Sequence, residues 1–186
     1  MNKIILLAFC FLLNNFVTSA QKQSVILEST QRPTDKVKKE FPYDITMADT
    51  SGKQISSSKI LKTKKKLTVL TFWATTCGPC RMELKAYNAK WEAWQKQFSD
   101  FNLVAVSIDF NDRHAAAMEV PKKENWQFAS YVDVRREFPL VMPGELNGLP
   151  QLFILDKKGE ILYTKKRYLS GDEDELFKKI IELGKQ

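Results

Sequence analysis

The chain has 186 residues, of which 44% are hydrophobic, 11% aromatic and 27% charged. This composition is typical of a globular domain with its own core, and it excludes a collagen-like or wholly disordered chain. The formal net charge of +7 comes from lysines spread along the chain, with one cluster at residues 62–66 that we interpret as a solvated loop. We therefore expect one domain that binds no nucleic acid.

The first 20 residues are predicted to be a cleaved secretory signal. Lys3 supplies the positive start, residues 4–13 form an unbroken apolar run, and small residues at 18–20 suit a signal peptidase. An apolar run of this length is too short to cross the roughly 30 Å hydrocarbon core as a helix, although an uncleaved anchor is the alternative. Phe9 before Cys10 disfavours a lipoprotein. We expect export to the periplasm or cell envelope.

Residues 21–40 are polar, lack periodicity and are predicted to be a flexible leader, so that the folded domain spans 41–186. Apolar residues alternate with polar ones before and after a turn at 49–53, which indicates a β-hairpin. A serine-rich stretch then predicts one short helical turn. Residues 67–73 are apolar on both faces, which is typical of a central strand.

From Pro79 the apolar residues recur at three- and four-residue steps, which predicts a helix of about 20 residues. A second buried strand is predicted at 103–109, and a helix at 112–120 that ends at Pro121. The remaining predictions are a short strand at 128–132, a helical turn at 134–138, a hairpin at 151–155 and 161–164, and a closing helix at 172–183. This order predicts an α/β fold: a mixed central β-sheet flanked by helices on both faces, with an N-terminal β-hairpin extension.

Two cysteines, Cys77 and Cys80, fall on the first junction between a buried strand and a helix. A structural disulfide is one interpretation, but closing a loop this short contributes only about 2 kcal/mol, less than bridging distant segments. A zinc site is a second, but it needs four ligands, and His114 is the only histidine to add to the pair. Copper could use the two thiolates and His114.

A redox-active pair is the third interpretation and the one we favour. At a helix start, the Cys77 sulfur would face free backbone N–H groups and the positive end of the helix dipole, which stabilise its thiolate. Cys80, one turn later, could then resolve a mixed disulfide. Gly78 and Pro79 suit the first turn, because proline lacks the N–H that would have no partner there.

The segment WATTCGPCR, following an apolar strand, resembles the active-site segment of the thioredoxin superfamily. The resemblance is more specific for its exported TlpA/ResA/CcmG-type members, which share an N-terminal hairpin, a Glu three residues past the second cysteine (Glu83) and a GxPxxFxxDxxG segment, here at 148–159. It implies a thioredoxin-like fold and a protein disulfide reductase, active in cytochrome c maturation or envelope redox homeostasis.

The resemblance also implies roles for individual residues. Pro150 would be a cis-proline facing the redox pair Cys77–Cys80, and Leu149 would offer its backbone to the substrate. Glu83 would tune proton transfer, although an exposed first-turn acid is the alternative. The role of Trp73 is divided between shielding the thiols and simple packing.

Three positions depart from the family pattern. Thr71 stands where cytoplasmic thioredoxins bury an Asp, which would leave Glu83 as the nearby acid. Thr76 replaces the usual Trp before the first cysteine, and Lys85 stands where exported relatives often have a helix-kinking Pro. The last two leave substrate recognition more open than the chemistry.

The expected partners are a disulfide-bearing client protein and a membrane-bound upstream reductant, with no cofactor and no stable metal. Two rival functions stay open at this point. One is a peroxidase of the same superfamily, for which the residues before Cys77 match only in part. The other is a non-enzymatic copper-binding or delivery module that uses His114.

Overall fold

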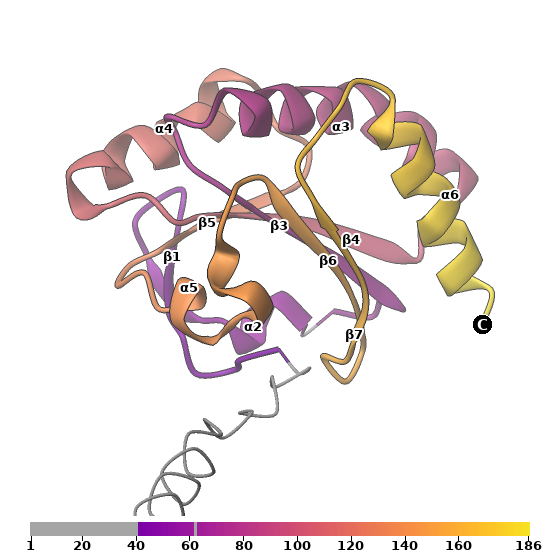
Figure 1. Cartoon of the computed structure of the whole chain (residues 1–186), viewed down its shortest axis with the longest axis horizontal. Helices are drawn as coiled ribbons and strands as arrows, with labels where there is room; N and C mark the ends of the chain where they lie inside the picture. Colours follow the sequence, from indigo (N-terminus) through magenta and orange to yellow (C-terminus); the bar gives the residue numbers. More distant parts are fainter. Residues whose placement is uncertain (1–40, 62) are drawn as a thin grey trace, which may run out of the picture. The chain divides into compact units, whose positions relative to one another are not determined.

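A seven-stranded mixed sheet forms the centre of the fold (Figure 1). The computed structural model describes residues 41–61 and 63–186. The predicted signal peptide (1–20) and leader (21–40) lie outside the described residues and stay predictions. Within the described ranges, no helix combines the length and the apolar character that crossing a bilayer requires.

The helices and strands follow the predicted order along the chain. They are β1 (Thr46–Asp49), β2 (Gln54–Ser56), α2 (Ser58–Leu61), β3 (Leu67–Trp73), α3 (Gly78–Gln97), β4 (Phe101–Ser107), η1 (Asn111–Arg113), α4 (His114–Lys123), β5 (Ala129–Asp133), α5 (Phe138–Val141), η2 (Pro143–Leu146), β6 (Gln151–Asp156), β7 (Ile161–Lys166) and α6 (Asp172–Gly184).

The strands are arranged in the order β2-β1-β5-β4-β3-β6-β7. The central strands β3, β4 and β5 are parallel, whereas β6 and β7 extend the sheet antiparallel on one side. The predicted N-terminal hairpin lies on the other side, where β1 pairs antiparallel with β5. The mixed sheet and the hairpin extension are thus confirmed, and the carboxyl ends of β3, β4 and β5 meet at one edge.

Helices cover both faces of the sheet, as predicted: α3, α4 and α6 lie on one face, and α2 and α5 on the other (Figure 1). The alternation along β3 shows how the two cores divide. Val69 and Trp73 pack beneath α3, whereas Leu70 and Phe72 point into the second core. All four side chains are fully buried, so the apolar character of this strand on both faces reflects its central place.

Two predicted helical segments have wrong boundaries. The helix expected at 112–120 starts as the 3-10 helix η1, continues as α4 from His114, and passes beyond Pro121 to Lys123. Its last turn is closed by the N–H of Glu124, which donates to the carbonyl of Val120 at 2.9 Å.

The helical turn predicted at 134–138 begins instead at Phe138, as α5. There the carboxylate of Asp133 accepts the N–H of Phe138 at 2.8 Å. Arg136 interrupts the predicted turn with a φ of 54°. A side-chain contact therefore decided where this helix starts.

The second buried strand is also displaced from its prediction. β4 begins at Phe101, where it pairs with Leu67, and ends at Ser107 rather than residue 109. Just past the strand, the carboxylate of Asp109 accepts hydrogen bonds from Thr75, in the segment before the cysteines.

The lysine cluster was interpreted as a solvated loop, and this holds only in part. The ammonium group of Lys65 donates to the carbonyl of Ser99 at 2.7 Å, just past the end of α3. That of Lys66 donates to the carbonyl of Gly184 at 2.7 Å, at the end of α6. Cations are favourable at helix carboxyl ends, where carbonyls lack intrahelical partners. Lys66 therefore binds the end of α6, whereas Lys65 binds the loop just past α3.

Candidate active site

Cys77 caps the start of α3, as the sequence predicted. The backbone N–H of Cys80 donates to the Cys77 sulfur at 3.2 Å, so a helix-start amide faces this atom. The two cysteines form a disulfide with their Cα atoms 5.3 Å apart. Cys77 is partly exposed, whereas Cys80 is fully buried at 0% exposure. One sulfur is therefore accessible to a partner and the other is enclosed.

Gly78 and Pro79 form the exposed first turn between the cysteines, and Pro79 occupies one of the first positions of α3. A Cβ atom added to Gly78 would meet nothing within 4 Å. Packing therefore does not require glycine at this position. Its effect is to leave the surface beside the disulfide open.

The peptide bond between Leu149 and Pro150 is cis, as the family resemblance implied. Strand β6 begins at the next residue, Gln151, which pairs with Phe72 of β3. This register brings Pro150 to the end of β3, at the same edge of the sheet as the cysteines. Pro150 is buried and Leu149 is partly exposed. The role of Leu149 in contacting a substrate stays a prediction.

Trp73 is fully buried in the core cluster that also contains Cys80. Its ring meets that of Trp126 edge to face, with centroids 5.1 Å apart. Trp126 in turn donates its Nε1–H to Glu124, which pairs with Arg81 of α3. Trp73 packs in the same core cluster as Cys80, and its role in shielding the thiols stays a prediction.

Glu83 is buried at 2% exposure rather than lying on the surface. Its carboxylate accepts a hydrogen bond from the hydroxyl of Thr71 on β3 and another from the hydroxyl of Tyr87, each at 2.9 Å. Burial raises the pKa of Glu83 to about 7, and the two hydrogen bonds oppose that rise. A carboxyl that titrates near neutral pH thus lies one helical turn beyond Cys80.

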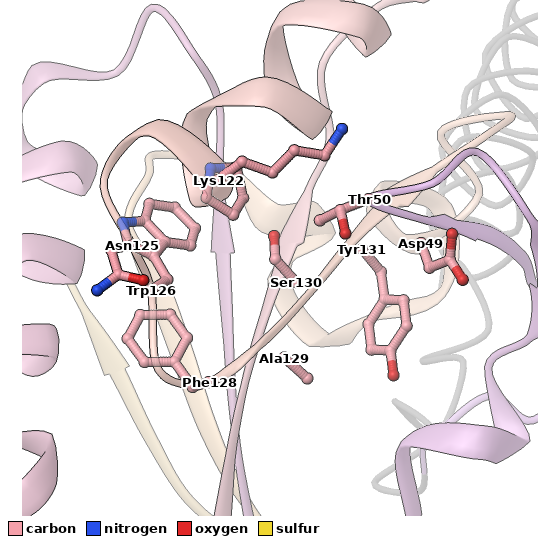
Figure 2. A pocket seen from close by; sticks show the side chains of 10 residues that line it. Asp49, Thr50, Lys122, Asn125, Trp126, Phe128, Ala129, Ser130 and Tyr131 are labelled. Carbon is pink, nitrogen blue, oxygen red and sulfur yellow. The ribbon is translucent and has the colours of Figure 1, made fainter.

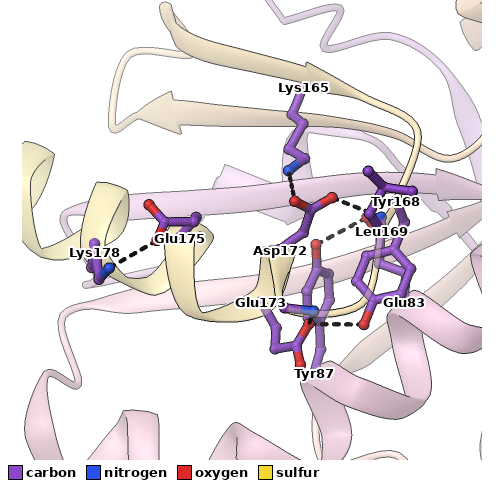
Figure 3. Close-up of polar contacts among 10 residues, drawn as sticks. Glu83, Tyr87, Lys165, Tyr168, Leu169, Asp172, Glu173, Glu175 and Lys178 are labelled. Carbon is purple, nitrogen blue, oxygen red and sulfur yellow. Dashed lines mark hydrogen bonds and ion pairs between the residues drawn. The ribbon is translucent and has the colours of Figure 1, made fainter.

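Figure 3 shows further polar groups near this carboxyl, which come from α3, β7, α6 and the loop between β7 and α6. Lys165 and Asp172 form an ion pair at 2.6 Å, with each side chain about a fifth exposed (23% and 21%). Lys165 lowers the pKa of Glu83 and Asp172 raises it, both by less than burial does. Burial also raises the pKa of Tyr87, which therefore keeps the proton that it donates. The sequence did not indicate Tyr87, Lys165 or Asp172 as neighbours of Glu83.

A second buried carboxylate, Asp109, reaches the segment before the cysteines and was also missed. Its Oδ2 accepts the backbone N–H of Thr75 at 2.8 Å and the hydroxyl of Ser107 at 2.7 Å. Its Oδ1 accepts the hydroxyl of Thr75 at 2.8 Å. The only signal in the sequence was an acidic residue at the end of an apolar run.

His114, the residue considered for copper, lies at the start of α4. Its Nε2 is 3.2 Å from the backbone carbonyl of Asp109, which can only accept, so the ring donates there. Across the described residues, no three His, Cys, Asp or Glu side chains gather closely enough to hold a metal ion.

A cavity of about 340 Å³ lies apart from the cysteines, between the β1–β2 turn, the end of α4 and β5 (Figure 2). Trp126 and Phe128 line one side with stacked rings, 5.3 Å apart, and Asp49 and Tyr131 line the other. Trp126 connects the cavity to the site, because the same ring packs on Trp73.

A cis-proline at the sheet edge, a disulfide at the start of α3 and a mixed sheet define a thioredoxin-like protein. The N-terminal hairpin β1–β2 and the relatives given below support the TlpA/ResA/CcmG type. The chain belongs to the AhpC/TSA family, whose model matches residues 37–164.

Two relatives come from Bacillus subtilis. Thioredoxin-like protein YneN is 29% identical over 155 residues, which cover 80% of this chain and 76% of that protein. Sporulation thiol-disulfide oxidoreductase A is 28% identical over 125 residues, which cover 67% and 71%. The solved structure of an uncharacterized thioredoxin-like protein from Porphyromonas gingivalis superimposes with a TM-score of 0.66 at 30% identity, over 78% of this chain and 92% of that one.

Proposed function

We propose that this chain, a thiol–disulfide oxidoreductase of the thioredoxin-like type, acts outside the cytoplasm and reduces disulfides in partner proteins. The different exposure of its two sulfurs carries the proposal. Cys77 reaches the surface at a helix start, and Cys80 is enclosed behind it. This arrangement supports Cys77 as the attacking group and Cys80 as the resolving group.

The exchange has two steps that balance in electrons. The Cys77 thiolate attacks one sulfur of the client disulfide, forms a mixed disulfide, and releases the other client sulfur as a thiolate. The Cys80 thiolate then attacks the Cys77 sulfur, which restores the Cys77–Cys80 disulfide and releases the second client sulfur. Two electrons pass to the client, and a separate reductant has to reduce the pair again.

Glu83 supports the second step. Cys80 must lose its proton before it attacks, and it is enclosed away from solvent. A neighbouring carboxylate with a pKa of about 7 accepts a proton near neutral pH far better than one with an ordinary pKa of 4.5. We therefore assign Glu83 as the group that exchanges a proton with Cys80.

Exposed apolar side chains at the same edge of the sheet support a polypeptide as the client. Phe110 follows Asp109, which contacts Thr75 just before the cysteines. Leu140 is exposed on α5, which follows the carboxyl end of β5 at this edge. Exposed apolar side chains at this edge offer contact area to a polypeptide client.

Export and reductive direction are the finer parts of the proposal. The N-terminal charge and apolar run support export, and Gly78-Pro79 between the cysteines resembles reductants of the superfamily. On this basis the client is a cytochrome c precursor or another envelope protein, and a membrane-bound reductant restores the dithiol.

The first experiment measures insulin disulfide reduction by the reduced protein. We expect Cys77→Ser to abolish the activity, and Cys80→Ser to accumulate a mixed disulfide between Cys77 and insulin. Equal activity of Cys77→Ser and wild type would contradict the proposal. Faster consumption of hydrogen peroxide than of protein disulfides, dependent on Cys77, would favour the peroxidase instead.

The second experiment determines whether this chain donates electrons to its client or accepts them, by measuring the Cys77–Cys80 reduction potential against glutathione. A potential near thioredoxin's, about −270 mV, supports a reductant. A potential near about −120 mV would show an oxidant and overturn the direction.

A further inference from the structure

We propose that Asp109 is a positioning residue: its carboxylate holds Thr75 and thereby fixes the turn that presents Cys77 at the start of α3. The proposal rests on the proposed function and adds a residue to it that touches neither sulfur. It concerns how the attacking sulfur is held, not which atoms react.

The backbone brings Asp109 beside this turn. Strands β3 and β4 are parallel, and Trp73 pairs with Ser107 at their carboxyl ends. The next residue, Ile108, donates its N–H to the carbonyl of Trp73 at 2.9 Å. The chains that leave the two strands therefore begin side by side, one toward the cysteines and one toward α4.

Among the described residues, the hydrogen bonds to the Asp109 side chain come from Thr75 and Ser107. Asp109 is 3% exposed, and burying a charge is costly unless hydrogen bonds replace its water. Two of the three donors on its side chain belong to Thr75, and the third belongs to Ser107. Hydrogen bonds to an ionised carboxylate are among the stronger ones in proteins.

Thr75 lies inside the turn that leads to the nucleophile. The N–H of Cys77 donates to the carbonyl of Ala74 at 3.0 Å, so the residues between them form one tight turn. The Asp109 carboxylate accepts hydrogen bonds from both the backbone N–H and the hydroxyl of Thr75 in that turn. The titratable side chain of His114, at the start of α4, donates to the backbone carbonyl of Asp109.

The consequence concerns the Cys77 sulfur, which faces the Cys80 N–H only while the turn holds its place. Without the anchor, Cys77 moves away from the helix start and its thiolate loses stabilisation. The charge of Asp109 alone would act in the opposite direction, because a nearby anion raises a thiol pKa and its removal lowers it. Loss of the anchor therefore predicts a higher Cys77 pKa, whereas loss of the charge alone predicts a lower one.

The test measures iodoacetamide labelling of Cys77 in the reduced full chain across pH, with mass spectrometry of the Cys77 peptide to separate it from the other cysteines. Asp109→Asn and Thr75→Val each remove part of the anchor. We expect both to raise the Cys77 pKa, and to slow insulin reduction on the order of tenfold to a hundredfold, as small misplacements of reacting groups do. Thr75→Ser keeps both donors and should behave like wild type.

Asp133→Asn is the matched control. Asp133 is also a buried aspartate at the carboxyl end of a parallel strand, but it holds the first residue of α5, Phe138, rather than the cysteine turn. We expect it to leave the Cys77 pKa and the rate of insulin reduction unchanged. A Cys77 pKa that is unchanged or lower in folded Asp109→Asn and Thr75→Val would overturn the proposal. If wild-type Cys77 labelled with the pH dependence of a free thiol, that result would instead contradict the proposed function itself.

Discussion

Glu83→Gln replaces a buried carboxyl, whose pKa the fold raises, with an amide that does not titrate. In the folded chain, burial raises the pKa of Glu83 from 4.5 to about 7. In the unfolded chain this carboxyl keeps its ordinary pKa. As pH rises, the unfolded state therefore releases the proton first, and the folded state loses stability through the pKa of about 7. The difference between the two pKa values corresponds to about 3 kcal/mol.

Gln has the shape of a protonated Glu but no proton to lose. The hydroxyls of Thr71 and Tyr87 can each donate or accept, so the amide can be satisfied at this place. We expect the unfolding free energy of Glu83→Gln, relative to wild type, to rise by about 3 kcal/mol between about pH 4 and pH 8. Urea denaturation of the oxidised protein at several pH values measures this, because the disulfide-bonded cysteines do not titrate.

Glu92→Gln on the same helix is the control. Glu92 is exposed and pairs with Lys96 at 2.7 Å, which lowers its pKa. Its replacement should therefore produce only a small change of the opposite sign. If Glu83→Gln tracked wild type in parallel from pH 4 to pH 8, Glu83 would ionise normally, and the reasoning from burial would be wrong.

Three further changes test the surroundings of the site and the packing of the domain. Thr71→Val removes a donor to Glu83, so NMR titration of the Glu83 carboxyl carbon should show a pKa above that of wild type; an equal or lower value would contradict the hydrogen bond. Gly184→Ala places a Cβ 2.3 Å from Cζ of Phe98, and should cost about 1–3 kcal/mol in urea denaturation; an unchanged midpoint would refute this clash. Trp94→Ala removes a ring stacked on α6 and should cost about 3–5 kcal/mol; a loss below 1 kcal/mol would mean that the stack contributes little.

Most of the fold could be predicted from local patterns. The apolar periodicity of α3 matches the helical repeat, and β3 is a short, doubly apolar run rich in β-branched and aromatic residues, which is typical of a buried strand. Their junction at Cys77 placed the redox pair before any contact was known. Two of the wrong boundaries lie beside side-chain contacts that the spacing of apolar residues does not contain. Asp109, just past the end of β4, accepts hydrogen bonds from Thr75, and Asp133 accepts the N–H of Phe138, the first residue of α5.

The candidate site was predictable in its sulfur chemistry but not in its electrostatics. Cys77, Cys80 and Pro150 lie where the sequence and the resemblance indicated. The burial of Glu83 was not decidable, because the carboxyl is enclosed by Thr71 from a strand and by groups of β7 and α6 far along the chain.

By itself, then, the sequence determined which segments become strands and helices and that two thiols share one helix start. These properties depend on residues within a turn or two of each other, where the separation along the chain fixes their relative positions. Only the tertiary structure decided the order of the strands, the neutral-range pKa of Glu83 and the anchoring of the cysteine turn by Asp109. Each of these depends on groups that the sheet brings together from separate elements, so no local pattern contains them.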